Sequence, residues 1–232
     1  MTQQRHENME KTLQIELRPE QEGDYRETEF LVREAFWNHY SPACNEHYLL
    51  HVMRECPDFV KELDYVAVCD GRIVGNVVYM KSHILTDQGE RQEVLSLGPI
   101  AVLPGYQGKG IGRMLIERTR ELARGMGSRA IFLCGDPDYY TRTGFVPAEQ
   151  FGIRTSEDNY FIALHAFELY EGALATSSGR YYESPAYYVD ERAATEFDKA
   201  FPPKPILQDT PTQRRFLEIA AMQRKRIVEE KP

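Results

Sequence analysis

A glycine-rich segment, Gln107-Gly108-Lys109-Gly110-Ile111-Gly112, is the part of the sequence with the most chemical content. It follows a strand-like run and opens a helix-like run, and its glycines leave the backbone N–H groups of the turn uncovered. Free N–H groups at a helix N-terminus form a nest of partial positive charge that suits a phosphate group. The segment therefore predicts a site for a phosphate-bearing ligand.

The charge around this segment favours an anionic ligand. From Gly105 to Arg129 the chain carries six basic and two acidic side chains, a local charge of +4 within a chain of −8. A simpler alternative is that four of these side chains form a solvated helix face: Arg113, Glu117, Arg120 and Arg124. Two nucleotide motifs do not fit. A P-loop needs Ser or Thr after its lysine, where Gly110 stands, and the dinucleotide fingerprint needs glycine where Arg113 stands.

The elements on either side predict a βαβ crossover. A strand over Val94 to Val102 precedes the glycine segment, a helix ending at Gly127 follows it, and Arg129 to Cys134 is again strand-like. The apolar residues Ile111, Leu115, Leu122 and Met126 would line one face of that helix. Such a crossover places the two strands parallel in one sheet. Gly98-Pro99 interrupts the first strand and predicts a bulge or a splay there, because proline removes a ladder donor.

The rest of the chain predicts one large mixed α/β domain over 13–184, after a polar leader, 1–12, and before a C-terminal extension, 185–232. The further strands expected are 13–17, 65–69, 73–85 and 160–167, and the further helices are one from Asp24, 45–54, 137–143 and about 212–230. Asp70-Gly71 is a strong signal for a tight hairpin turn.

The last predicted helix has two distinct surfaces. Its apolar residues are expected to pack either on the domain or on a second copy of the chain as a homodimer: Phe216, Ile219, Ala220 and Ile227. Arg224-Lys225-Arg226 is expected to be a solvated helix C-terminus, where cations are favourable.

Two motifs in register resemble the GCN5-related N-acetyltransferase (GNAT) family. Ile100-Ala101-Val102-Leu103-Pro104 followed by Gln107, Gly110 and Gly112 resembles the family's pyrophosphate-binding motif, and Tyr140-x-x-x-Gly144-Phe145 resembles a second family segment. The order of the predicted elements is similar from Leu13 to about Leu164. The sequence beyond Phe145 resembles a bacterial branch whose acceptors are largely unassigned.

The resemblance implies a mixed, splayed sheet flanked by helices and acetyl-CoA as the acetyl donor, with no metal. The pyrophosphate would bind the backbone of Gln107, Gly108, Lys109, Gly110, Ile111 and Gly112, with Arg113 beside it. The pantetheine arm would lie where two parallel strands diverge at Gly98-Pro99, bonded by the backbone of Ile100, Ala101 and Val102. The acceptor would be a small-molecule or peptide amine.

Acetyl transfer to an amine needs a group that deprotonates the amine and a proton for the leaving thiolate. Tyr140 matches the family tyrosine that donates this proton; the alternative is that it packs the short helix. Ser96 stands where some members of the family have a glutamate or histidine base, and a hydroxyl is no base at neutral pH. Glu93, Asp136, Asp138 or a water chain remain as routes for the proton.

Other features narrow the class of protein. The composition, 42% hydrophobic and 28% charged, is that of a folded chain, and no apolar run approaches the roughly 20 residues of a membrane helix. The net charge of −8 argues against nucleic acid and anionic membranes as partners. Four cysteines without a CxxC pair predict reduced thiols in the cytoplasm. His47 and His51 have a metal-compatible i, i+4 spacing, but satisfied or exposed histidines are the simpler expectation.

Two functions therefore remain in view from the sequence. The first is an acetyl-CoA-dependent N-acetyltransferase that acts by direct transfer in a ternary complex. The second is a non-catalytic acyl-CoA-binding or regulatory module, which the presence of Ser96 in place of an acid or histidine motivates.

Overall fold

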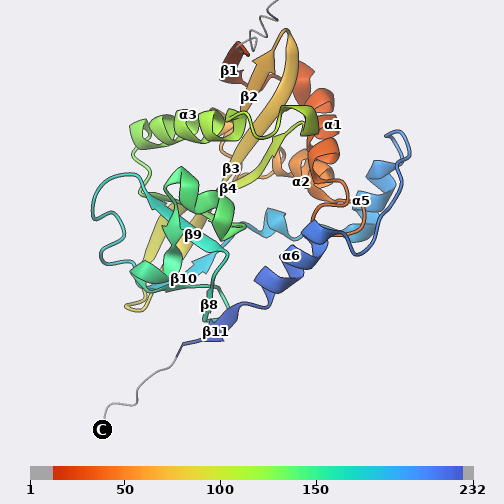
Figure 1. Ribbon diagram of the computed structural model, residues 1–232. Helices are drawn as coiled ribbons and strands as arrows, with labels where there is room; N and C mark the ends of the chain where they lie inside the picture. The colour runs from red at the N-terminus through yellow and green to blue at the C-terminus, as the bar shows by residue number, and fades with distance from the viewer. Residues whose placement is uncertain (1–12, 227–232) are drawn as a thin grey trace, which may run out of the picture.

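The central sheet grows from a hairpin whose turn is set by Asp70 and Gly71. Both residues have a positive φ, 50° and 78°, which is the geometry of a tight two-residue turn between twisted strands. The turn joins β2 (Tyr65–Cys69) to β3 (Arg72–Thr86), and the two strands pair antiparallel as predicted. The computed structural model describes residues 13–226, so the predicted leader 1–12 lies outside the described residues (Figure 1).

Nine strands form the main sheet in the order β1-β2-β3-β4-β5-β9-β6, with β10 paired to β3 and to β7. The remaining strands of this sheet are β1 (Ile15–Pro19), β4 (Arg91–Val102), β5 (Ala130–Cys134), β6 (Val146–Pro147), β7 (Ile153–Arg154), β9 (Leu164–Glu168) and β10 (Gly179–Tyr182). β4 and β5 are parallel and joined by a helix, as the βαβ prediction requires, while the other pairs of the main order are antiparallel. The sheet is therefore mixed.

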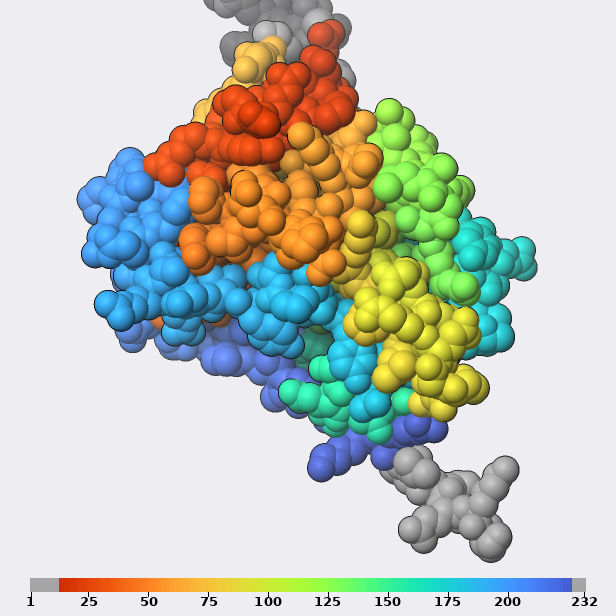
Figure 2. Space-filling model, turned by 180° about the vertical axis from the view of Figure 1, so that it is seen from behind, coloured from red at the N-terminus to blue at the C-terminus, as the bar shows by residue number. Residues whose placement is uncertain are grey.

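Helices cover both faces of the sheet. They are α1 (Tyr25–Phe36), α2 (Glu46–Met53), α3 (Ile111–Gly125), α4 (Pro137–Tyr140), α5 (Glu191–Asp198) and α6 (Pro211–Ala220). α3 crosses the face turned to the viewer in Figure 1, and α1 and α2 cover the face seen in Figure 2. A Cβ on Gly75 of β3 would lie 3.1 Å from side-chain atoms of both Ile111 and Leu115, so this glycine lets α3 approach the sheet closely.

Two segments differ from the prediction because backbone pairing divides them. The expected strand 160–167 is broken by a turn at Ile162 and Ala163, giving β8 (Asn159–Phe161) and β9. The expected helix 212–230 ends at Ala220, because the chain then forms β11 (Gln223–Lys225), which pairs antiparallel with β8. Ile227 and the rest of the predicted helix lie outside the described residues.

Arg224-Lys225-Arg226 is consequently not a solvated helix end. Arg224 forms an ion pair with Glu149, and Arg226 with Asp87 at 3.1 Å. Of the predicted apolar stripe, Ile219 is buried in this chain, and Phe216 is half exposed with its ring centroid 5.2 Å from that of Tyr40. The homodimer contact stays a prediction.

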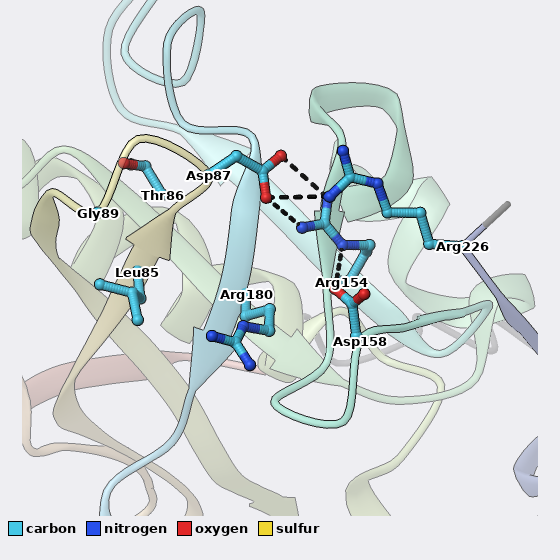
Figure 3. A pocket seen from close by; sticks show the side chains of 8 residues that line it. All are labelled: Leu85, Thr86, Asp87, Gly89, Arg154, Asp158, Arg180 and Arg226. Carbon is cyan, nitrogen blue, oxygen red and sulfur yellow. Dashed lines mark hydrogen bonds and ion pairs between the residues drawn. The ribbon is translucent and has the colours of Figure 1, made fainter. Parts of the chain in front are cut away.

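Asp87, in the turn after β3, links β7 to the segment that follows β11. It accepts hydrogen bonds from Arg154 of β7, at 2.5 Å, and from Arg226 just beyond β11, as Figure 3 shows. These side chains line a surface cavity of about 410 Å³. Because Arg154 is almost fully buried and pairs with Asp158 as well, this cluster fastens the end of the extension to the sheet.

The C-terminal extension is also fastened to α1 and α2. The Arg33 guanidinium, 1% exposed, pairs with Asp198 of α5 at 2.5 Å, and His47 of α2 lies 3.0 Å from the same carboxylate. Further along, the Pro205 carbonyl oxygen accepts hydrogen bonds from Trp37 Nε1 and from the Asn38 side chain. Figure 2 shows this segment, in blue, packed beside α1 and α2.

Replacing Asp198 by alanine should lower the free energy of unfolding by about 2 to 4 kcal/mol, because Arg33 would remain buried without its carboxylate. Urea unfolding followed by circular dichroism measures this change. Glu196→Gln is the matched control: its pair with Lys199 is exposed on both sides, so a loss under about 1 kcal/mol is expected. Equal effects of the two substitutions would contradict the anchoring role of Asp198.

Candidate active site

The glycine segment folds as a cradle of free backbone N–H groups; cradle here means residues 107–112. Gly108 and Gly110 adopt φ values of 73° and 83°, which side chains disfavour, and Gly110 is the N-cap residue of α3. Within the described residues, no acceptor binds the backbone N–H groups from Gly108 to Arg113. The positive end of the α3 dipole lies at the same place, so the cradle presents both donors and charge to an anion.

Two side chains, Gln107 and Tyr139, make close contacts at the cradle. Gln107 donates a hydrogen bond from Nε2 to the Val102 carbonyl oxygen at 3.0 Å, which ties the loop to the end of β4. The Tyr139 hydroxyl lies 2.7 Å from the position that a Cβ on Gly112 would take. Gly112 therefore leaves room for the Tyr139 hydroxyl at the mouth of the cradle, a contact that the sequence analysis did not foresee.

The basic residues of the segment are divided between its two ends. Lys109 and Arg113 lie at the cradle, where Arg113 pairs with Glu117 on the solvated face. Arg124 instead donates to the Leu169 carbonyl oxygen at the other end of α3. Arg120 is buried and stacks on the Phe167 ring at 3.6 Å, so the solvated-face alternative is wrong for this side chain. The local charge of +4 is thus only partly available to a ligand.

β4 and β5 separate beyond a short paired region. They pair only at Leu95 with Ile131 and at Ser96 with Phe132, and the β3–β4 register shifts opposite the Gly98-Pro99 peptide, which is cis. The predicted irregularity at Gly98-Pro99 is confirmed. The edge of β4 that includes Ile100, Ala101 and Val102 therefore has no β5 partner among the described residues, and its backbone is open toward the gap.

Tyr140 lies at the end of α4, next to that gap. Asp136 caps the helix by accepting a hydrogen bond from the Asp138 N–H, and a Cβ on Gly135 would lie 2.1 Å from the Tyr140 ring, so only glycine allows this packing. Burial raises the pKa of Tyr140 well above its usual value, which keeps the phenol protonated. No group among residues 13–226 hydrogen-bonds its hydroxyl. That hydroxyl is available to a ligand.

A cluster of five side chains surrounds the paired end of β4 and β5. This inner cluster consists of Ser96, Cys134, Tyr181, Glu183 and Tyr187. Tyr181 bonds the Ser96 hydroxyl and stacks on Phe132 with 4.8 Å between ring centroids, and Tyr187 donates to the Gly98 carbonyl oxygen at 2.9 Å. The predicted Ser96 thus lies in the inner cluster as a hydrogen-bonding partner of a phenol.

Three members of this cluster come from a segment in which the sequence predicted no strand. Tyr181 and Glu183 lie on and just after β10, a strand that was not predicted, and Tyr187 follows it. A Cβ on Gly179 would lie 2.3 Å from the Leu85 carbonyl oxygen, so glycine fixes the close approach of β10 to β3. The sequence carries no periodic signal for this strand, because Tyr181 and Tyr182 are adjacent and do not alternate with polar residues.

The other predicted proton acceptors are already engaged by arginines. Glu93 pairs with Arg91 at 2.8 Å on the surface. Asp136 and Asp138 both pair with Arg215 of α6, and the hydrogen bond from Arg215 lowers the pKa of Asp136. A carboxylate with a lowered pKa is a weaker base. The catalytic role of these residues stays a prediction.

The two histidines at i, i+4 face different carboxylates. His47 is fully buried against Asp198, and burial lowers its pKa to about 4, whereas His51 Nδ1 lies 2.8 Å from Glu29 Oε1. Throughout residues 13–226, no three or more His, Cys, Asp and Glu side chains gather as metal ligands would. Within the same residues, no helix has the length and apolar character needed to cross a membrane.

The fold and the cradle define an α/β protein with free backbone N–H groups beside a splayed parallel strand pair. The family model for the acetyltransferase (GNAT) family matches residues 16–145. This match covers more than half of the 232 residues, and the chain therefore belongs to that family, as predicted. The predicted mixed α/β fold is likewise confirmed.

Two Escherichia coli proteins are similar to this chain in sequence. It is 38% identical to the uncharacterized N-acetyltransferase YjhQ of Escherichia coli over 87 residues, which are 37% of this chain and 46% of that one, so the match spans about half of YjhQ. It is 30% identical to the uncharacterized N-acetyltransferase YhbS of E. coli over 132 residues, 56% of this chain and 76% of YhbS.

Solved structures agree with this placement. The crystal structure of E. coli YhbS in complex with CoA has a TM-score of 0.67 at 26% identity, covering 75% of this chain and 92% of that one. A GNAT acetyltransferase of Brucella melitensis in complex with acetyl-CoA has a TM-score of 0.60 at 24% identity, covering 75% and 98%, and supports the fold alone.

Proposed function

We propose that this chain transfers the acetyl group of acetyl-CoA to a primary amine by direct attack in a ternary complex. The observation that carries the proposal is the cradle of free N–H groups beside the open edge of β4. The pyrophosphate would bind the backbone of 107–112, and the pantetheine arm would enter the gap along Ile100, Ala101 and Val102. The CoA of the YhbS crystal structure supports this donor.

Tyr140 is the residue we propose to protonate the leaving thiolate. Its hydroxyl has no hydrogen-bond partner among the described residues, and its ring packs against Gly135, just past the end of β5. A phenol is a weaker acid than a thiol, so proton transfer from Tyr140 to the thiolate is unfavourable when the two groups are free in solution. The transfer therefore needs the phenol and the sulfur to be held together. The packing of Tyr140 against Gly135 supplies that fixed position.

Direct transfer is favoured over a covalent acetyl-enzyme by the state of Cys134. This free cysteine ends β5, the strand that separates from β4, and burial together with the charge of Glu183 raises its pKa. Only the thiolate is a strong nucleophile, so a thiol with a raised pKa does not accept the acetyl group readily. The amine is then the group that attacks the thioester. The chain's net charge of −8 favours a cationic acceptor.

Saturating acetyl-CoA should raise the melting temperature by about 5 to 10 °C. A ligand present at about 100 times its dissociation constant adds roughly 2.7 kcal/mol to the folded state. A chain of this size gains about 2 to 4 °C per kcal/mol. Differential scanning fluorimetry with acetyl-CoA and with coenzyme A measures the shift, and no shift with either compound would contradict the cradle.

The alternative, a non-catalytic acyl-CoA-binding module, makes a different prediction. It binds acetyl-CoA with the same thermal shift but releases no coenzyme A thiol in the presence of amines. A thiol-release assay across alkyl amines, polyamines, amino acids and lysine-containing peptides separates the two functions. Sustained release with any one of these acceptors contradicts the module.

A further inference from the structure

The pattern of the sheet brings one unpaired carboxylate to the proposed transfer site. Side chains two residues apart on a strand share a face. Phe132 and Tyr181 stack on one face of the sheet, and Ser96 bonds Tyr181 there. The next residues along the same face are Cys134 on β5 and Glu183 just after β10. The inner cluster thus lies where β4 and β5 begin to separate.

Glu183 belongs to this cluster. Burial raises the pKa values of Cys134, Tyr181 and Tyr187, and the charge of Glu183 raises them further. Among residues 13–226, no lysine, arginine or histidine forms an ion pair with it. Burial raises the pKa of Glu183 above its usual value. A carboxylate in this state is a stronger base than one on the surface.

The strand directions place Glu183 and Tyr140 at the same end of β5. β10 and β5 run in the same direction, so Glu183 follows Tyr181 toward the same end of the sheet as Cys134 follows Phe132. Tyr187, in the same segment as Glu183, donates a hydrogen bond to the Gly98 carbonyl oxygen at 2.9 Å, where β4 and β5 separate. The Tyr140 ring packs against Gly135, just past the end of β5.

Glu183 also has a route to solvent. It lines a surface cavity of about 440 Å³, and the other titratable or charged side chains of this cavity are Asp58, Lys81, His83, Arg91, Glu93, Tyr182 and Tyr188. Glu93 lines the same cavity but is held by Arg91. Of the carboxylates around the gap, Glu183 alone among the described residues combines partial burial, a raised pKa and freedom from an ion pair.

We propose that Glu183 is the general base that deprotonates the amine acceptor, an assignment that rests on the proposed acetyl transfer. The acceptor arrives as an ammonium ion, and Glu183 takes one proton and releases it to solvent. The neutral amine attacks the thioester carbonyl carbon, forming the C–N bond. As the C–S bond breaks, Tyr140 gives its proton to the sulfur, and the second proton lost by the nitrogen restores the Tyr140 hydroxyl. The products are the amide, coenzyme A and one proton.

The kinetic test compares Glu183→Gln with Asp58→Asn, a change of the same kind at another acid that lines the same cavity. With the best acceptor from the amine panel, Glu183→Gln should lower kcat/KM for the amine about tenfold or more at neutral pH. The dissociation constant of acetyl-CoA should not change, and Asp58→Asn should behave as the wild type. Equal rates of the Glu183→Gln variant and the wild type would overturn the proposal.

The pH profile separates a base from a merely structural residue. A base acts in its ionised form, so the wild-type rate should fall as the pH drops through the raised pKa of Glu183 and level off above it. Without this base, only the neutral amine reacts. For an amine of pKa about 10, the rate of Glu183→Gln should then rise about tenfold per pH unit and approach the wild type in alkali. A variant profile parallel to the wild type would contradict the role.

A second measurement needs no acceptor. Alkylation of Cys134 by iodoacetamide, followed by peptide mass spectrometry, should be about threefold faster or more in Glu183→Gln, because the charge that raises the thiol pKa is gone. Coenzyme A should protect Cys134 in both proteins. Protection without acceleration would refute the placement of Glu183, whereas acceleration without protection would refute the proposed cofactor site.

Discussion

Replacing Gly110 by glutamate should raise the dissociation constant of acetyl-CoA about 100-fold or more, a loss of roughly 3 kcal/mol. The new carboxylate would stand at the positive end of α3, where it would compete with the pyrophosphate for the free N–H groups and repel it. The φ of 83° at this position also disfavours any side chain, so the cradle itself would shift. Isothermal titration calorimetry with acetyl-CoA measures the change.

Gly127→Glu is the matched control for this experiment. Gly127 follows the other end of the same helix, has a φ of 77°, and has no atom within 4 Å of the position of an added Cβ, which is equally true of Gly110. Both substitutions therefore add the same charge and similar backbone strain. If the two variants bound acetyl-CoA equally well, the loss could not be assigned to the cradle.

Tyr140→Phe should lower kcat about 100-fold or more, because removing a general acid typically costs at least that much. The ring stays in place, so the packing against Gly135 is kept and the dissociation constant of acetyl-CoA should be unchanged. Steady-state thiol release with the best acceptor gives kcat, and calorimetry gives the dissociation constant. Full turnover by this variant would eliminate Tyr140 as the acid.

Tyr139→Phe provides the contrasting change one residue earlier. The Tyr139 hydroxyl lies at Gly112, at the mouth of the cradle, while its ring meets the Tyr140 ring edge to face with 4.9 Å between the centroids. We expect this variant to change the affinity for acetyl-CoA by a few-fold and to leave kcat intact. The pair of variants thus separates binding from chemistry at adjacent tyrosines.

Local patterns were sufficient to predict the backbone geometry of the proposed cofactor site. The cradle, the interruption at Gly98-Pro99 and the parallel pair β4 and β5 all follow from short stretches whose residues impose their own backbone geometry. Glycine at positive φ and proline in a strand act on their immediate neighbours. For this reason the expected elements from β2 to α3 agree with the structure to within a few residues.

The acceptor half could not be predicted in the same way, because tertiary contacts decide it. Arg120 has the sequence signature of a surface arginine, yet two aromatic rings from Phe145 and Phe167 cover it. β10 is too short to stand out by periodicity, and only its pairing with β3 makes it a strand. Arg215 neutralises Asp136 and Asp138 from 79 and 77 residues away, a pairing that no local pattern reveals.

Residues far apart in the sequence meet at the proposed active site, and this separation has a consequence for folding during biosynthesis. A nascent chain that has emerged only as far as residue 145, where the family match ends, already holds the cradle and Tyr140. Tyr181, Glu183 and the anchor Asp198 emerge later, and contacts of such sequence separation form slowly. During synthesis, therefore, the ability to capture the cofactor should appear before the ability to use it, and bound coenzyme A could stabilise the splayed strands while the extension closes over them.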